Sequence, residues 1–185
     1  MNAAGPRGGL VRPAVPGDAR AIATVHVATW RDAYAGLLPG EILAGLDVDE
    51  RAETWRGRLA DPAEGMFVLV AELGGEVRGF VSAGPDRAGG AGGEVYAIYV
   101  DPGWQGRGAG SRLLQAAAEC LAGAGFTEAR LWVFADNHPA RGFYESQGWR
   151  PDGTEQQWTY PGTSRSLTDI RYVRNLALPV SPGPS

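Results

Sequence analysis

The chain has 185 residues, of which 44% are hydrophobic and 21% charged, and its formal net charge is −4. This size and balance fit one globular domain, and the negative charge argues against a nucleic-acid partner, which needs a broad basic surface. A single cysteine excludes a disulfide scaffold, and neither a bilayer-spanning apolar run nor a secretory segment is evident. We therefore expect a cytoplasmic protein with no membrane partner.

The two ends of the chain differ in composition from the rest. Residues 1–9 are rich in Gly, Ala and Pro, and residues 177–185 are rich in Pro, so both are predicted to be flexible. Residues 10–176 contain no linker, repeat or long charge run. One folded domain over residues 10–176 is predicted.

The chain begins with a predicted strand and helix. Leu10–Arg12 precedes Pro13 and has the character of a short strand. Asp18 stands where a helix N-cap belongs. Side chains then recur at helical spacing at Ile22, Val25, His26, Thr29 and Trp30.

A second amphipathic stretch precedes a predicted hairpin. Its apolar side chains are Leu43, Leu46, Trp55 and Leu59, and Asp61-Pro62 ends it. The segments 66–72 and 77–83 are predicted strands, and the Gly74-Gly75 pair between them is typical of a tight hairpin turn.

The second half predicts a further alternation of strands and helices. Residues 94–100 are the most β-prone run of the chain, and a helix follows with the apolar stripe Leu113, Leu114, Ala117, Ala118 and Leu121. Residues 130–134 form a predicted strand, and 139–147 a short helix. Residues 154–160 and 170–173 are predicted as the last two strands, which completes a mixed α/β fold around one sheet.

The loop between the β-prone run and the helix has the sequence QGRGAGS over residues 105–111. Glycines let backbone N–H groups approach an anion, and a helix N-terminus adds partial positive charge, so the pattern favours phosphate binding. A glycine loop that only turns the chain is equally compatible. A P-loop is excluded because the chain has no lysine, and Ser111 occupies the third glycine position of a dinucleotide-binding fingerprint. The spacing QxxGxG is satisfied by Gln105, Gly108 and Gly110.

Two segments resemble signatures of the GNAT acetyltransferase superfamily. YAIYVDPGWQGRGAGSRLL, residues 96–114, is similar to its acyl-CoA-binding motif. ADNHPARGFYESQGW, residues 135–149, is similar to its second signature, an Asn followed seven residues later by a Tyr. The resemblance covers residues 94–150. It implies an acetyl-CoA-dependent N-acetyltransferase with a single α/β domain, whose mixed, mostly antiparallel sheet is flanked by helices on both faces.

The resemblance also assigns roles to individual residues. The pantetheine arm of acetyl-CoA would lie along Ile98, Tyr99 and Val100, and Asn137 would contact the same arm. Tyr144 matches the tyrosine that protonates the departing CoA thiolate. The pyrophosphate would be cradled by the loop residues Gln105, Gly106, Arg107, Gly108, Ala109, Gly110 and Ser111.

The base that deprotonates the acceptor amine has two candidates. Glu94 aligns with the glutamate base of the histone acetyltransferase branch, whereas many family members use ordered water. Some relatives carry a glutamate base five residues before the motif's Asn. That position is Trp132 here, so this third mechanism is excluded.

The acceptor side carries weaker signals. Trp30 and Tyr34 are four residues apart on one helix face, where they could line an acceptor pocket or simply pack in the core. Residues 31–53 hold six acids against two arginines, an excess that favours a cationic acceptor if it is not merely solvated. The sequence does not identify the acceptor.

Three other residues are predicted to be structural. Cys120 is expected to pack as a buried thiol, His26 as a core histidine, and His138 as a capping or packing residue. No set of side chains has the spacing of a metal site, so no metal is expected. The resemblance is compatible with a homodimer, and a non-catalytic acyl-CoA sensor on the same fold remains the alternative to an enzyme.

Overall fold

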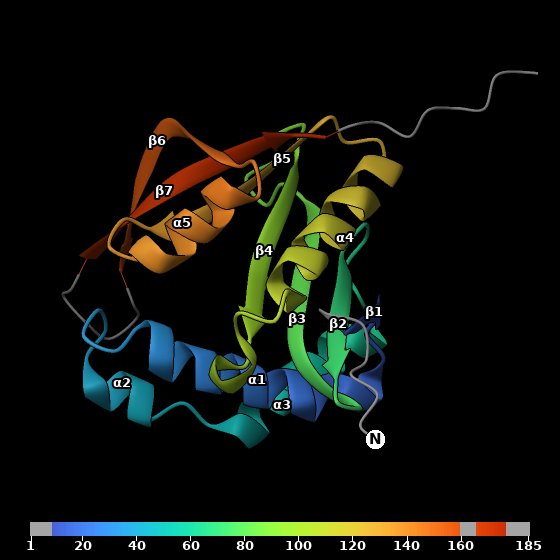
Figure 1. Ribbon diagram of the computed structural model, residues 1–185, viewed down its shortest axis with the longest axis vertical. Helices are drawn as coiled ribbons and strands as arrows, with labels where there is room; N and C mark the ends of the chain where they lie inside the picture. Colours follow the sequence, from blue (N-terminus) through green and yellow to red (C-terminus); the bar gives the residue numbers. More distant parts are fainter. Residues whose placement is uncertain (1–8, 160–165, 177–185) are drawn as a thin grey trace, which may run out of the picture. The chain divides into compact units, whose positions relative to one another are not determined.

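The computed structural model describes residues 9–159 and 166–176. Short 3-10 turns at Pro16–Asp18 and Pro102–Trp104 precede two of the helices. The strands and helices (Figure 1) are, in chain order, β1 (Leu10–Pro13), α1 (Ala19–Ala33), α2 (Gly40–Ala44), α3 (Val48–Ala60), β2 (Phe67–Leu73), β3 (Glu76–Pro85), β4 (Gly93–Val100), α4 (Ala109–Gly123), β5 (Glu128–Phe134), α5 (His138–Ser146), β6 (Arg150–Thr159) and β7 (Ser166–Asn175).

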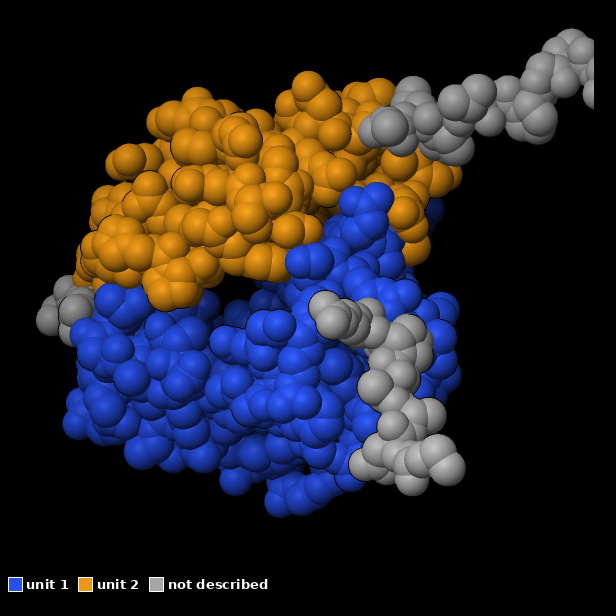
Figure 2. Space-filling view, viewed as in Figure 1, with its two compact units in different colours: residues 1–84, 96–117 blue, residues 85–95, 118–185 orange. Residues whose placement is uncertain are grey.

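Two compact units make up the chain. One consists of residues 1–84 and 96–117, and the other of residues 85–95 and 118–185 (Figure 2). Strand β4 and helix α4 each contribute residues to both units. The tails predicted to be flexible, apart from Gly9, lie outside the described residues.

One sheet contains all seven strands in the order β1-β2-β3-β4-β5-β7-β6. The β1–β2, β2–β3, β5–β7 and β6–β7 pairs are antiparallel, and β4–β5 is parallel. Gly74 and Gly75 join β2 to β3 with φ values of 64° and 83°, which confirms the predicted hairpin turn. The ladder between β4 and β5 covers only Gly93 and Glu94 of β4. The expected mixed, mostly antiparallel sheet is confirmed.

Helices pack on both faces of the sheet within the first unit. Helices α1 and α3 form one buried cluster with Val68 and Val70 of β2 and Phe80 of β3. Gly79 points to the opposite face because successive strand residues alternate. A side chain at Gly79 would lie 3.1 Å from Leu113 of α4, so α4 packs closely there. This arrangement confirms the expected helices on both faces.

Two predictions about the helices differ from the structure. The stretch from Leu43 to Leu59 is two helices, because Asp47 caps α3 by accepting the amide N–H of Glu50 at 2.8 Å. Asp18 precedes α1 but makes no side-chain cap. Its carboxylate accepts instead from Arg12 at 2.7 and 2.9 Å and from the Val15 amide at 2.8 Å. Arg12, six residues before Asp18, thus competes successfully with the helix N-terminus for this carboxylate.

The prediction that Cys120 is buried is wrong, since its side chain is exposed. Leu113, Leu114, Ala117 and Leu121 are buried as predicted. Cys120 lies at the margin of this buried stripe rather than at its centre. The last two strands are longer than predicted, and Tyr160 lies outside the described residues.

Candidate active site

The glycine-rich loop begins with a turn that Asp101 organises. Its backbone N–H donates to the carbonyl of Arg78 at 2.8 Å, and its Oδ1 accepts the amide of Gly103 at 3.0 Å. Arg78 donates to the other carboxylate oxygen at 3.2 Å. The loop is therefore tied to strand β3 before the glycines begin.

Trp104 anchors the same loop through its indole ring. The guanidinium groups of Arg78 and Arg107 lie 4.9 and 4.6 Å from the ring centroid, within cation–π range. The ring also lies against the hairpin turn, 3.3 Å from where a side chain at Gly74 would begin. Sequence reasoning missed that Trp104 and Arg78 support the glycine loop, because Arg78 and Gly74 are distant from Trp104 in the chain.

The glycines themselves adopt a conformation that other residues rarely take. Gly106 and Gly108 have φ values of 71° and 86°, and both are exposed. Gln105 donates through Nε2 to the carbonyl of Val100 at 3.3 Å, which links the loop to the end of β4. Helix α4 starts at Ala109, and its first-turn amides lack intrahelical acceptors. An exposed glycine loop opening a helix is suited to hold an anion.

Helix α1 meets the carboxyl end of β4 through polar and aromatic contacts. Thr29 Oγ1 donates to the carbonyl of Val100 at 3.2 Å, and Trp30 Nε1 donates to the Tyr99 hydroxyl at 3.0 Å. The rings of Trp30 and Tyr34 make an edge contact with centroids 5.1 Å apart. Desolvation raises the pKa of Tyr99, which therefore remains a neutral phenol. The structure thus brings together Trp30, Tyr34 and Tyr99, which are half-buried at β4, the strand that leads into the glycine loop.

His26 lies beneath this aromatic group, and the expectation of a core histidine is confirmed. It is 8% exposed and stacks on Tyr99 at a centroid distance of 5.1 Å. Its Nδ1 accepts from Trp55 Nε1 at 3.3 Å, so the proton of the neutral ring is on Nε2, which has no partner among the described residues. Burial, and then the charges of Arg51 and Arg58, lower the pKa of His26 to about 3.

This lowered pKa predicts an acid-sensitive fold. Between pH 3 and 6.5 the unfolded chain binds a proton at His26 that the folded chain does not, so stability falls as the pH falls through that window. We expect His26 to cost about 3 kcal/mol of unfolding free energy between pH 7 and pH 4. Urea unfolding of wild type and His26→Gln across this range measures the difference in slope. Parallel curves for wild type and His26→Gln would contradict the prediction.

Helix α5 carries Tyr144 and is held at its start. Asn137 caps it by accepting the amide of Ala140 at 3.2 Å, and Arg141 donates to the carbonyl of Ala135 at 2.8 Å. Tyr144 is 9% exposed, and its ring centroid lies 6.2 Å from that of Tyr172 on β7. Asn137 and Tyr144 thus belong to one firmly anchored helix. The exposed His138 does not supply the cap.

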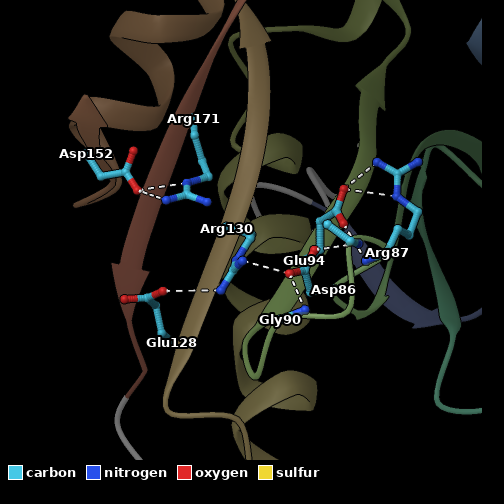
Figure 3. A network of polar contacts seen from close by, with 9 residues as sticks. Asp86, Arg87, Gly90, Glu94, Glu128, Arg130, Asp152 and Arg171 are labelled. Atoms are coloured by element: carbon cyan, nitrogen blue, oxygen red, sulfur yellow. Dashed lines mark hydrogen bonds and ion pairs between the residues drawn. The ribbon is translucent and has the colours of Figure 1, made fainter. Parts of the chain in front are cut away.

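Glu94 is 2% exposed, and its carboxylate is already engaged. It accepts from the backbone N–H and the Nε of Arg87, each at 3.0 Å, and forms an ion pair with the same guanidinium (Figure 3). Asp86 holds the other side of this loop by accepting the amides of Ala88 at 3.0 Å and Gly90 at 2.8 Å. Both acids therefore order the segment between β3 and β4.

The acidic excess of residues 31–53 is partly consumed by local contacts. Asp49 pairs with Arg20, Glu53 pairs with Arg56, and Asp47 caps α3. These contacts favour the interpretation of this excess as a solvated surface. Within the described residues, no three His, Cys, Asp or Glu side chains are grouped to hold a metal ion. None of the helices described combines the length and apolarity needed to cross a membrane.

Comparison with known proteins identifies the class. The family model described as Acetyltransferase (GNAT) family matches residues 27–149. An uncharacterized N-acetyltransferase of Bacillus subtilis (strain 168) is 39% identical over 138 residues, which cover 74% of this chain and 77% of the relative. The chain therefore belongs to the GNAT acetyltransferase family, a class of acyltransferases, as the two sequence motifs predicted.

Solved structures agree with this fold. The PaiA N-acetyltransferase from Thermoplasma acidophilum, determined with coenzyme A, has a TM-score of 0.73 at 19% identity, covering 90% of this chain and 98% of its own. The putative acetyltransferase YncA from Salmonella typhimurium, determined with acetyl-CoA, has a TM-score of 0.66 at 22% identity, covering 94% and 96%. At these identities the likeness establishes the common fold.

Proposed function

We propose that this chain transfers an acetyl group from acetyl-CoA to a primary amine of a small molecule or peptide, by direct attack in a ternary complex. The observation that carries the proposal is the loop before α4, where Gly106 and Gly108 expose backbone at positive φ at a helix N-terminus. Family membership and the two structural relatives determined with coenzyme A or acetyl-CoA support the choice of ligand.

The residues of this chain fit such a cosubstrate. Amides of the loop and the first turn of α4 would bind the pyrophosphate. The pantetheine arm would pair with β4 as an added strand does, which requires backbone groups that no neighbouring strand uses. Ile98, Tyr99 and Val100 lie beyond the two-residue ladder of β4 with β5. Asn137 is proposed to contact the same arm. Bound acetyl-CoA supplies an activated thioester.

Chemistry at the thioester requires two hydrogen donors, one at the carbonyl oxygen and one at the departing sulfur. A backbone N–H of the end of β4 would stabilise the negative charge on the carbonyl oxygen as the amine nitrogen attacks the carbon. The Tyr144 hydroxyl would give its proton to the sulfur as the carbon–sulfur bond breaks. The products are the N-acetyl amine and the CoA thiol, and no covalent bond to the protein forms.

For the proton of the attacking amine we propose ordered water rather than Glu94. The Glu94 carboxylate is almost fully buried and holds Arg87 through both its backbone and its side chain. A base must be able to reach the proton that it removes. The engaged carboxylate is better suited to order the segment between β3 and β4.

Glu94→Gln distinguishes these two assignments. We expect the unfolding free energy to fall by about 1–3 kcal/mol, because a charge-assisted hydrogen bond is lost, and kcat to change by less than about threefold. Denaturation curves and steady-state kinetics measure the two quantities. Glu128→Gln, at the exposed edge of the same network, should change neither. A 10²-fold or larger fall in kcat, with loss of the acid limb of the pH profile, would identify Glu94 as the base instead.

The proposed function is tested by CoA thiol release from acetyl-CoA with a panel of polyamines, aminoglycosides, amino acids and peptides. Release with one class establishes the transfer and identifies the acceptor class. Binding of acetyl-CoA with no release for any amine would favour the non-catalytic sensor. Absence of acetyl-CoA binding would contradict both assignments.

A further inference from the structure

One peptide group, between Val100 and Asp101, is held from both sides where β4 leads into the glycine loop. Its N–H, on Asp101, donates to the Arg78 carbonyl of β3 at 2.8 Å. A trans peptide directs its N–H and C=O in opposite directions, and no described peptide bond is cis. The Val100 carbonyl therefore points away from β3, toward the edge of β4 along which the pantetheine arm is proposed to lie.

Two side chains donate to this carbonyl. Thr29 Oγ1 of α1 donates at 3.2 Å, and Gln105 Nε2 of the glycine loop donates at 3.3 Å. A carbonyl oxygen has two lone pairs, so both are used within the fold. The plane of this peptide is thus fixed by one residue from a helix, one from a strand and one from the loop.

The Thr29 hydroxyl serves the end of β4 rather than its own helix. A threonine hydroxyl on a helix commonly donates to the carbonyl four residues earlier, as Thr24 does to Arg20 at 2.9 Å. Thr29 is 6% exposed and instead reaches a carbonyl 71 residues away in the chain. The next residue, Trp30, donates to the Tyr99 hydroxyl at 3.0 Å. Two consecutive residues of α1 therefore contact two consecutive residues of β4.

We infer that Thr29 is a positioning residue for the pantetheine arm of acetyl-CoA, which acts through the Val100 peptide and does not touch the cosubstrate. The inference rests on the proposed function, because it requires the arm to lie along residues 98–100. A backbone segment that is already ordered loses little further freedom when a ligand pairs with it. Since the Val100 carbonyl is occupied, the arm is left with the Val100 N–H, which an extended strand directs to the same edge.

Thr29→Val tests this role, because valine keeps the branched shape and removes the hydroxyl. We expect the Kd for acetyl-CoA to rise about five- to tenfold, the effect of losing one buried hydrogen bond. The Kd for adenosine 3′-phosphate 5′-diphosphate, which is CoA without the pantetheine arm, should change by less than about twofold. This fragment would contact the glycine loop, which Asp101 and Trp104 continue to support. Calorimetric titration measures both constants.

Two further variants of α1 are the controls. Thr29→Ser keeps the hydroxyl and should restore the Kd for acetyl-CoA to within about twofold of the wild-type value. Thr24→Val removes an exposed hydroxyl of the same helix and should bind both ligands as wild type does. Thermal unfolding verifies that all three variants are folded. A purely structural role of Thr29 would lower the Tm of Thr29→Val and leave both Kd values unchanged.

The outcomes separate this inference from the proposed function. Equal Kd values for acetyl-CoA in wild type and Thr29→Val, an equal loss for both ligands, or no rescue by Thr29→Ser would overturn the role of Thr29 and leave acetyl transfer standing. The expected binding pattern with no transfer to any amine would contradict the enzyme and keep the role of Thr29. Absence of acetyl-CoA binding by wild type would overturn both.

Discussion

Replacing Tyr144 with phenylalanine is expected to lower kcat for acetyl transfer by about 10²–10⁴-fold. The phenol is proposed to protonate the departing sulfur, and phenylalanine removes that proton while keeping the ring. Because the ring is 9% exposed and packs near Tyr172, the variant should fold normally. Thiol release with the best amine of the panel measures kcat, and calorimetry should show an unchanged Kd for acetyl-CoA.

Tyr172→Phe is the matched control for this experiment. The Tyr172 hydroxyl donates to Glu145 at 2.8 Å and accepts from Arg141 at 3.2 Å, so its removal should lower the unfolding free energy by about 1–2 kcal/mol. Its kcat should stay close to that of wild type, because the hydroxyl is used within the fold. A threefold or smaller loss in Tyr144→Phe would mean that another group or water protonates the sulfur.

Replacing Gly108 with valine is expected to weaken acetyl-CoA binding by at least about 100-fold. The residue has φ 86° in an exposed loop, and a branched side chain there would occupy the space in which an anion meets the backbone amides. Loss of two charge-assisted hydrogen bonds is sufficient for an effect of this size. Calorimetric titration with acetyl-CoA, and with CoA to exclude an effect of the acetyl group, measures the change in Kd.

Gly125→Val separates ligand contact from backbone strain. Gly125 lies just beyond the other end of α4, has φ 93°, and has open space where a side chain would begin. Valine at either glycine carries a strain of about 1–2 kcal/mol. Gly125→Val should therefore lose comparable stability and retain acetyl-CoA affinity. Equal affinities for the two variants would refute the phosphate-binding role of the loop.

Signals between residues close in sequence predicted most of the fold correctly. The paired glycines at 74 and 75 predicted the hairpin because both need positive φ, and the periodic apolar residues of 113–121 predicted a buried helix face. The glycine loop and the Asn–Tyr spacing predicted the GNAT family. Helix-cap patterns were insufficient where another side chain competes for the same carboxylate. Asp18 has the identity of a cap residue, yet Arg12 takes its carboxylate.

The sequence by itself determined the element types, the order of the motifs and the family, because these depend on spacing along the chain. Only the tertiary structure decided which polar groups are already satisfied. Glu94 and Asp169 are both acids on predicted or neighbouring strand positions, but Arg87 neutralises the first and no arginine of the described chain pairs with the second. The physical reason is that the segment between β3 and β4 places Arg87 against Glu94, whereas the register of β5, β6 and β7 decides which side chains share a face with Asp169, and a carboxylate's chemistry depends on those neighbours.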